Sequence, residues 1–375
     1  MMDPWHDVRV VLLAGGRGER FWPRSTEARP KQFLQVDGKE SLLRSTYARA
    51  AALTSLESIY VVTHERYADL VRKELPALPE ANLILEPCAR NTAAALGLAA
   101  RRLGPQSIIV AMPSDHHITG PARFRVTLQT AVEVARHEHL VAIGIPPTRP
   151  ETGYGYIRRG APLELPTALP AFRVERFAEK PDRATAEEYL ACGDYAWNSG
   201  ILVARADVLD QEICRHLPEL HAALEEVGWA GQEGTRLPPT VAEQFAGLPG
   251  ISIDKGVLER SDRVAMVPGH FGWNDVGDWA ALSRLLPLDE NGNAVIGEVL
   301  LQDARRVVVH GGDRLVVLLG VSDLIVVDTP KVLLVCAREQ AQEVRQVARI
   351  GAAFADALVA CGEAEASEGG SPCPA

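Results

Sequence analysis

Three glycines and four basic residues follow the first apolar run of the chain, and together they could hold a polyphosphate. The glycines are Gly15, Gly16 and Gly18. The basic residues are Arg17, Arg20, Arg24 and Lys31. Residues without Cβ allow a tight turn with exposed N–H groups, and cations at this density neutralise phosphate oxygens. A strand-to-helix turn with a solvated basic face explains the same residues without any ligand.

The common glycine-loop signatures do not fit this segment. A dinucleotide-binding loop needs a third glycine where Phe21 stands, and a P-loop needs Gly-Lys-Ser/Thr at its end. The segment therefore predicts an anion site of another kind.

Two aspartates could supply the oxygen ligands of a divalent cation. Asp115 ends the apolar run 107–112, and Asp275 lies in a segment rich in glycine and tryptophan at 269–279. Mg²⁺ takes one or two carboxylates and completes its shell with water and substrate phosphates. The alternatives are a cap or turn role for Asp115, a packed turn with Trp273 and Trp279 around Asp275, and Asp278 as the ligand in its place.

The polar groups between the two aspartates suit a hydroxyl-rich ligand. They stand among glycines or aromatic residues in three segments, 150–157, 177–182 and 197–201. The sequence suggests no Ser-His-Asp or Cys-His arrangement.

Composition limits the class of protein. The 375 residues are 47% hydrophobic and carry a formal charge of -10, which is ordinary for a globular protein and unfavourable for binding nucleic acid or an anionic membrane. The N-terminus has no secretory signal, and the six cysteines form no CxxC pair or zinc pattern. We therefore expect a cytoplasmic protein with reduced cysteines.

The elements that must position these residues alternate along the first 150 residues. Strand patterns at 8–13, 58–63, 83–85, 107–112 and 140–145 alternate with helical patterns at 42–53, 67–75, 92–103 and 124–137. This order predicts an α/β fold, with a Rossmann-like, mostly parallel mixed sheet flanked by helices. Ligands bind outside the carboxyl ends of the strands in such sheets, where the glycine turn and Asp115 both fall.

The last part of the chain has a different pattern. Closely spaced strand patterns from 292 to 336 predict a small β-helix-like domain, and 338–360 predicts a helix with Val344, Val347 and Ile350 facing a core. We therefore expect a catalytic domain over 1–290, a small domain with its terminal helix over 291–361 and a disordered tail over 362–375. The small domain and its helix could form a homodimer surface.

These motifs, in this order, resemble the sugar nucleotidyltransferase family, and most closely its mannose-1-phosphate guanylyltransferase branch. The matching segments are LAGGRGERFWPRS, PKQF, EPCARNTAAA, PSDHHI, GIPPTRPETGYGYI, FAEKPD, WNSGI, SID and FGWNDVGDW. The resemblance implies the nucleotide-diphospho-sugar transferase fold and the transfer of GMP from GTP to mannose 1-phosphate. Longer members carry a cupin-type isomerase after the transferase, so a monofunctional enzyme is expected here.

The resemblance also implies roles for individual residues. Nucleotide binding falls to Gly15, Gly16, Gly18, Glu86, Asn91 and Thr92. Catalytic cations are Arg20, Lys31 and Lys180. Sugar contacts are Gly153, Glu179 and Asn198. Asp115 and Asp275 bind Mg²⁺ or another divalent cation.

Some alternatives stay open at this point. Glu179 could form only a surface salt bridge and Thr92 could be a helix cap. The whole chain could act on another sugar 1-phosphate or base, or could be a regulatory relative that binds GDP-mannose without catalysis.

Overall fold

The computed structural model describes residues 4–16, 18–36, 38–225 and 239–351, which form two compact units. The first comprises the residues up to Gly15 together with Leu43–Asp275, and the second comprises Gly16–Leu42 together with the residues from Val276 onward. Residues 16–42 and 276–290 thus belong to the same compact unit as the C-terminal strands. The boundary predicted from the sequence, at residue 290, placed them in the catalytic domain. A functional division into 1–290 and 291–361 stays a prediction. The predicted tail over 362–375 lies outside the described residues.

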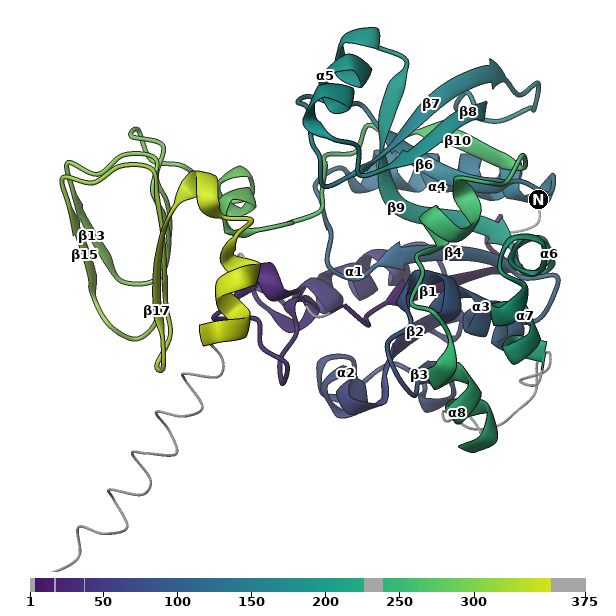
Figure 1. The fold of residues 1–375 in the computed structure, drawn as a ribbon, viewed down its shortest axis with the longest axis horizontal. Helices are drawn as coiled ribbons and strands as arrows, with labels where there is room; N and C mark the ends of the chain where they lie inside the picture. The colour runs from purple at the N-terminus through teal and green to yellow at the C-terminus, as the bar shows by residue number, and fades with distance from the viewer. Residues whose placement is uncertain (1–3, 17, 37, 226–238, 352–375) are drawn as a thin grey trace, which may run out of the picture. The chain divides into compact units, whose positions relative to one another are not determined.

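The first unit is built on a nine-stranded sheet with the order β3-β2-β1-β4-β9-β6-β10-β8-β7 (Figure 1). Its strands are β1 (Val8–Leu13), β2 (Ile59–His64), β3 (Leu83–Glu86), β4 (Ile108–Pro113), β6 (Leu140–Ile145), β7 (Gly155–Pro162), β8 (Phe172–Glu179), β9 (Tyr195–Arg205) and β10 (Val264–Pro268). A separate two-stranded pair joins β5 (His117–Ile118) to β11 (Trp273–Asn274).

The sheet is mixed, with more antiparallel pairing than the sequence predicts. The strands from β3 to β4 and the pair β6–β10 are parallel, as expected. β9 runs antiparallel to β4, β6 and β7, and β8 runs antiparallel to β7 and β10. The β7–β8 hairpin reverses the chain without a crossover helix, so β9 enters the middle of the sheet in the opposite direction.

Helices cover both faces of this sheet, as predicted. They are α1 (Leu42–Ala51), α2 (Ala68–Glu74), α3 (Asn91–Leu103), α4 (Pro121–Arg136), α5 (Arg183–Cys192), α6 (Ala206–His216), α7 (Pro218–Glu225) and α8 (Pro239–Gly247). Alternate strand residues such as Val11, Ala111 and Leu202 share one core with α3, α6 and α7. Their buried neighbours point to the other face. There α4 packs against β4, β6, β9 and β10.

The second unit contains short parallel coils, in agreement with the β-helix-like prediction. Its strands are β12 (Ala294–Ile296), β13 (Val299–Gln302), β14 (Val308–His310), β15 (Val316–Leu319), β16 (Leu324–Asp328) and β17 (Leu333–Ala337). β12, β14 and β16 are parallel to one another, β13 is parallel to β15, and β17 closes the edge in the antiparallel direction. Among the helices of both units that the structure describes, none is both long enough and apolar enough to cross a bilayer.

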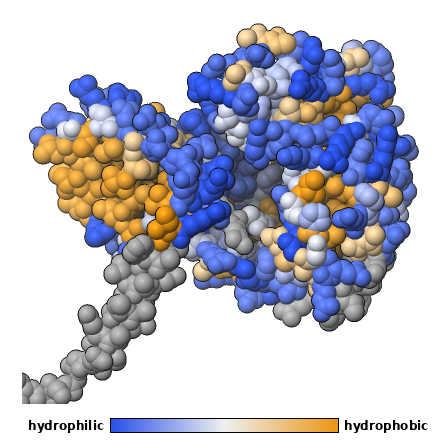
Figure 2. Space-filling view, viewed as in Figure 1, coloured by the Kyte–Doolittle hydropathy of each residue, from blue (hydrophilic) through white to orange (hydrophobic). Residues whose placement is uncertain are grey.

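The outer surface of the second unit is apolar over β13, β15 and β17 (Figure 2). The exposed side chains there include Leu300, Val317, Leu319, Leu333 and Val335. Leu301, Val316 and Leu318 alternate with exposed residues along β13 and β15, and they pack against a small core formed by Val307, Val309 and Val326.

The terminal helix is only partly as predicted. The structure has a short turn at Arg338–Gln340 and a helix over 344–351, and the predicted part beyond 351 lies outside the described residues. Val344 is buried, but Val347 and Ile350 are 48% and 64% exposed, so the predicted core-facing stripe is wrong for these two. The buried face is instead Ala341, Val344 and Ala348, whose spacing also fits a helix.

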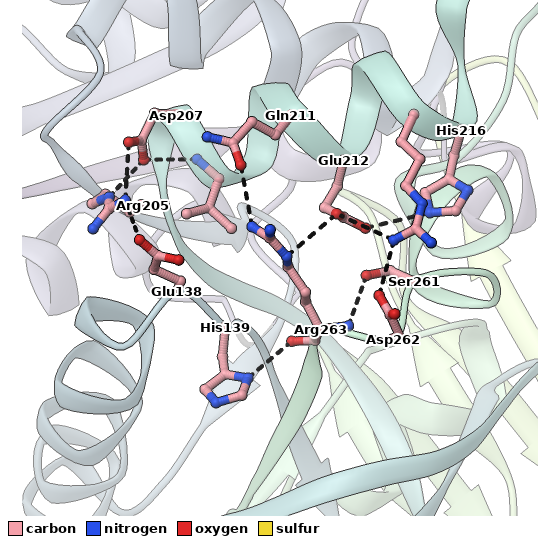
Figure 3. A network of polar contacts seen from close by, with 12 residues as sticks. Glu138, His139, Arg205, Asp207, Gln211, Glu212, His216, Ser261, Asp262 and Arg263 are labelled. Carbon is pink, nitrogen blue, oxygen red and sulfur yellow. Dashed lines mark hydrogen bonds and ion pairs between the residues drawn. The ribbon is translucent and has the colours of Figure 1, made fainter.

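A polar network ties α6 to the edge of the sheet where β9 ends and β10 begins (Figure 3). Its centre is Glu212, whose side chain is 3% exposed. Oε1 of Glu212 lies 3.7 Å from Nε of Arg263, and its Oε2 lies 3.3 Å from Nε2 of His216. Glu138, at the rim, is 58% exposed and pairs with Arg205 at 3.1 Å.

We expect Glu212→Ala to lower the free energy of unfolding by about 1–3 kcal/mol, because it removes a buried acid and leaves Arg263 and His216 without this partner. Glu138→Ala is the matched control, and we expect it to cost less than about 0.5 kcal/mol because its pair is solvated. Urea titrations of the two variants measure both values. Equal losses would contradict the central role of Glu212.

Candidate active site

The pairing of β5 with β11 brings the segments of the two predicted metal ligands to one place. Asn274 pairs with His117 in an antiparallel register. Asp275 therefore leaves the pair at the end where the chain enters from β4 through Asp115 and His116. The two acids lie 160 residues apart in the sequence, yet they flank the same end of a two-stranded pair.

Aromatic side chains hold this pair of segments. The hydroxyl of Tyr154 donates a 2.5 Å hydrogen bond to Oδ1 of Asp275. Nε1 of Trp273 donates to Nδ1 of His116 at 3.1 Å, and Nε2 of His116 lies 3.8 Å from Oδ1 of Asp115. Burial, and then the negative charge of Asp275, raise the pKa of Tyr154, so its hydroxyl stays a donor.

A cavity of about 240 Å³ lies beside Asp275. Its polar lining includes Gly153, Glu179, Asn198, Asp254 and Asp275. The predicted sugar-binding residues, which are spread over the chain from 153 to 198, therefore meet around one space, together with a predicted metal ligand.

Hydrogen bonds within this cavity fix its acids. Nδ2 of Asn198 donates to Oδ1 of Asp254 at 2.7 Å, and Nζ of Lys180 donates to Oε1 of Glu179 at 2.7 Å. Burial, and then the charge of Glu179, raise the pKa of Asp254 to about 6, while the bond from Asn198 acts in the opposite direction. Hydroxyl groups of a sugar can donate to carboxylates placed in this way.

Three of the predicted nucleotide-binding residues, Glu86, Asn91 and Thr92, lie at the end of β3 and the start of α3. Glu86 is 4% exposed, its Oε1 has no hydrogen-bond partner among the described residues, and its Oε2 lies 3.2 Å from where a Cβ on Gly15 would stand. Burial raises the pKa of Glu86 to about 8. Asn91 begins α3 with a φ of 67°. The carboxyl group of Glu86 thus adjoins the first glycine of the predicted phosphate turn.

The second unit contains the rest of the predicted phosphate site. Gly18 has a φ of 64° and precedes a short helix, Glu19–Phe21, that includes Arg20. Lys31 is 6% exposed, and its Nζ lies 5.6 Å from the centre of the Phe21 ring. A Cβ on Gly18 would come within 2.2 Å of Cβ of Lys31, so only glycine fits here. Gly16 has open space around its Cα.

The carboxylates of Asp115 and Asp275 are hard oxygen donors of the kind Mg²⁺ prefers. Among the residues that the structure describes, no group of three or more His, Cys, Asp or Glu side chains is arranged to hold a metal ion. The residues present fit an ion that takes few protein ligands and fills its shell with substrate oxygens.

Contacts in the structure also bear on the alternatives left open by the sequence. Thr92 lies inside α3, for which the described part of the chain supplies no side-chain cap, and its Oγ1 accepts a hydrogen bond from the amide of Ile253 at 2.9 Å, so Thr92 is not a helix cap. The side chain of Glu179 is 15% exposed and lines the cavity, unlike a surface salt bridge. Oδ1 of Asp278 accepts from the amide of Ala281 at 2.9 Å and caps the short helix Trp279–Arg284, which explains this acid without a ligand.

Sequence reasoning missed Asp254 as a residue of the site. It appeared only in the motif Ser252-Ile-Asp254, and local spacing does not reveal that it meets Asn198, 56 residues earlier. The motif itself was the signal that could have found it. Asp254 is an acid in a segment that resembles the family, and the acids in the other such segments were assigned ligand roles.

Two family models match the chain. The model described as "Nucleotidyl transferase" matches residues 9–291, and the one described as "MannoseP isomerase/GMP-like beta-helix domain" matches residues 297–349. The first match covers more than half of the chain.

Curated proteins and one solved structure are similar over most of the chain. The chain is 37% identical to the mannose-1-phosphate guanylyltransferase of Klebsiella pneumoniae over 341 residues, which are 90% of this chain and 72% of that protein. It is 38% identical to the xanthan biosynthesis protein XanB of Xanthomonas campestris over 347 residues, 91% and 72% of the two chains. A crystal structure from Thermus thermophilus, described as a mannose-1-phosphate geranyltransferase, shares 37% identity with a TM-score of 0.81 and covers 92% of this chain and 98% of that one.

Proposed function

We infer the reaction from one premise: this chain belongs to the nucleotidyl transferase family and, within it, to the mannose-1-phosphate guanylyltransferases. It transfers GMP from GTP to α-D-mannose 1-phosphate and yields GDP-mannose and pyrophosphate. A phosphate oxygen of mannose 1-phosphate attacks the α-phosphorus of GTP. The bond from that phosphorus to the oxygen that bridges to the β-phosphorus breaks, and pyrophosphate leaves.

The observation that carries this proposal is the cavity shared by Gly153, Glu179, Asn198, Asp254 and Asp275. It supports a sugar held by carboxylate and amide groups directly beside a predicted metal ligand. Glu179, Asn198 and Asp254 bind sugar hydroxyl groups in this proposal, and Lys180 binds the sugar phosphate. Nζ of Lys180 donates a 2.7 Å hydrogen bond to Oε1 of Glu179, and this bond orients the lysine.

We assign the nucleotide to the glycine turn and the neighbouring end of β3. The backbone N–H groups of Gly15, Gly16 and Gly18 bind phosphate oxygens. Arg20 and Lys31 neutralise the charge that develops on the triphosphate. Asn91, Thr92 and Glu86 form the base side of the site.

Asp115 and Asp275 would hold a magnesium ion, which supplies charge neutralisation between two polyanions when bound. Tyr154 and Trp273 keep these acids in place through the contacts described above. Catalysis then depends on positioning and on fixed positive charge, since both substrates repel each other in water. The predicted cytoplasmic location and the homodimer stay predictions.

A substrate panel tests the function. Purified enzyme is given each of GTP, ATP, UTP and dTTP with mannose 1-phosphate or glucose 1-phosphate, and pyrophosphate release is measured. We expect GTP with mannose 1-phosphate to give the highest kcat/KM. A preference for another base or sugar would assign the chain another substrate, and no release from any pair would favour a regulatory protein.

Glu86 should contribute to the choice of base. Burial raises the pKa of Glu86 to about 8, and the two donors of a bound guanine, N1–H and the 2-amino group, would favour its carboxylate form, which accepts from both. Hypoxanthine lacks the 2-amino group and so offers one donor fewer. We expect the kcat/KM ratio of GTP over ITP to fall by about tenfold in Glu86→Gln, the value of roughly one charged hydrogen bond. An unchanged ratio with lower activity on both nucleotides would give Glu86 a structural role.

A further inference from the structure

A second cavity, of about 600 Å³, lies in the first unit between the start of α4, the β7–β8 hairpin and the end of β10. We call it the α4 groove. Its lining residues are Ala122, Arg123, Val126, Thr127, Arg159, Leu169, Pro170, Phe172, Pro268 and His270. None of them lines the cavity beside Asp275. The volume lies within the range of about 300–1,000 Å³ that small-molecule sites occupy.

The α4 groove combines an apolar floor with a cationic rim. Val126, Leu169, Pro170, Phe172 and Pro268 supply apolar surface, and Val126 is 37% exposed although it is a large apolar residue. No acidic residue is found among the described residues of the lining. Exposed apolar surface in a concave site marks a place where a ligand displaces water.

Two arginines give the rim its charge. The guanidinium of Arg159 lies 5.2 Å from the centre of the Phe172 ring, which fixes it over the floor. Its only acidic neighbour within the described ion pairs is Asp194, at 3.7 Å and 48% exposed, which neutralises it weakly. Nη1 of Arg123 donates a long 3.5 Å hydrogen bond to the carbonyl oxygen of His270, which uses one of the five N–H donors of the guanidinium.

The start of α4 adds to this positive character. α4 has 16 residues and begins with Pro121 after Gly120, and no side chain of the described residues caps its first N–H groups. The positive end of the helix dipole therefore lies beside Ala122 and Arg123 in the groove wall.

We propose that the α4 groove is a second ligand site that binds a small, free amphipathic anion, with an apolar body on Val126 and Phe172 and a phosphate or carboxylate group between Arg123 and Arg159. The lining supports both halves of this description. An apolar floor alone would bind apolar molecules, and two arginines alone would bind anions. The groove combines both features, so it favours a ligand that has both parts.

The walls of the groove continue directly into the segments of the predicted metal ligands. α4 follows β5 through Thr119 and Gly120, and residues 268–270 lead into β11 through Phe271 and Gly272. The amide of Gly120 donates to the carbonyl oxygen of Phe271 at 2.9 Å, and a Cβ on Gly272 would come within 1.9 Å of Oγ1 of Thr119. A ligand bound between α4 and residues 268–270 would therefore shift the segments that continue into the β5–β11 pair. We expect this shift to change the rate of turnover. This regulatory half rests on the proposed function, and the binding half does not.

Octyl phosphate is the probe for binding, because it has an apolar body and a phosphate head. Titration by calorimetry, with mannose 1-phosphate at saturation to occupy the sugar-phosphate site, should give one site with a Kd on the order of 1 mM or tighter. Inorganic phosphate and 1-octanol, which each lack one half of the probe, should bind at least tenfold more weakly. Equal binding of either half would overturn the proposal.

Three variants locate the site. Arg123→Ala and Arg159→Ala remove the rim charges, and Val126→Trp fills the floor from a position that is 37% exposed. We expect each to weaken octyl phosphate binding by fivefold or more. Arg183→Ala, which removes a 77% exposed arginine outside the groove, is the control and should leave the Kd unchanged. Binding that survives all three groove variants would place the probe elsewhere, for example on the apolar surface of the second unit, and would overturn the proposal.

Two further measurements complete the test. Octyl phosphate should change kcat or KM of wild-type GDP-mannose synthesis at least twofold, and Val126→Trp should abolish that change while keeping its own basal rate. If the wild type binds octyl phosphate without any change in the rate of synthesis, the regulatory half of the proposal is wrong. If the wild type synthesises no GDP-mannose, the proposed function is wrong, and the binding half is then judged by the calorimetry alone. Sedimentation with phosphatidylglycerol vesicles that is lost in the same variants would assign the groove to a lipid headgroup and overturn the choice of a free ligand.

Discussion

Changing Asp115 to Asn is expected to lower kcat by about 100-fold or more, which is the size of effect seen when a single group that stabilises transition-state charge is removed. The substitution keeps the shape of the side chain and removes its negative charge. Asp115 follows β4 after one residue, Ser114, and lies beside the end of the β5–β11 pair that leads to Asp275. A neutral amide there would hold Mg²⁺ weakly, and two polyanionic substrates would repel each other.

The measurement is pyrophosphate release as a function of magnesium concentration, with Mn²⁺ binding by electron paramagnetic resonance as a second readout. Asp275→Asn should behave like Asp115→Asn in both. Asp278→Asn is the matched control from the same motif, because Asp278 caps a short helix and Asn caps almost equally well. Normal turnover in Asp115→Asn, or an equal loss in Asp278→Asn, would contradict the metal assignment.

The sequence predicted the parts of the site that follow from local rules. Asp115 was found because it ends an apolar run, and parallel strands deliver their carboxyl ends to one edge of a sheet. The helices were found from their periodicity, and α4 buries Phe124, Leu128 and Ala131 at the expected spacing. Asp275 was found from its motif and not from its place in a strand, since β11 is only two residues long.

The contacts that build the site could not be predicted in this way. The bond from Tyr154 to Asp275 spans 121 residues, and no periodicity within either segment specifies it. The sequence predicted no direction for the segment that forms β9, because an apolar strand has the same pattern in a parallel and in an antiparallel position. Val347 and Ile350 were placed in a core because helical spacing shows that residues share a face, and it does not show which face packs.

Lys31→Ala is the second change for which we expect a large loss, of about 100-fold in kcat/KM, because a fixed positive charge near the reacting phosphates is removed. Lys31 is 6% exposed, and its Nζ lies 5.6 Å from the centre of the Phe21 ring, so burial and this contact hold the ammonium group in one place. Lys39→Ala, which removes an exposed lysine of the same segment, is the control and should leave kcat/KM unchanged.

Gly18→Ala tests how that lysine is positioned. The new Cβ would stand 2.2 Å from Cβ of Lys31 at a φ of 64°, so either the turn or the lysine must move. We expect a loss of kcat/KM that approaches the loss in Lys31→Ala. In the double variant the two losses should not add, because displacing a side chain has no further effect once that side chain is gone. Additive losses would instead mean that the backbone at Gly18 binds the nucleotide independently of Lys31.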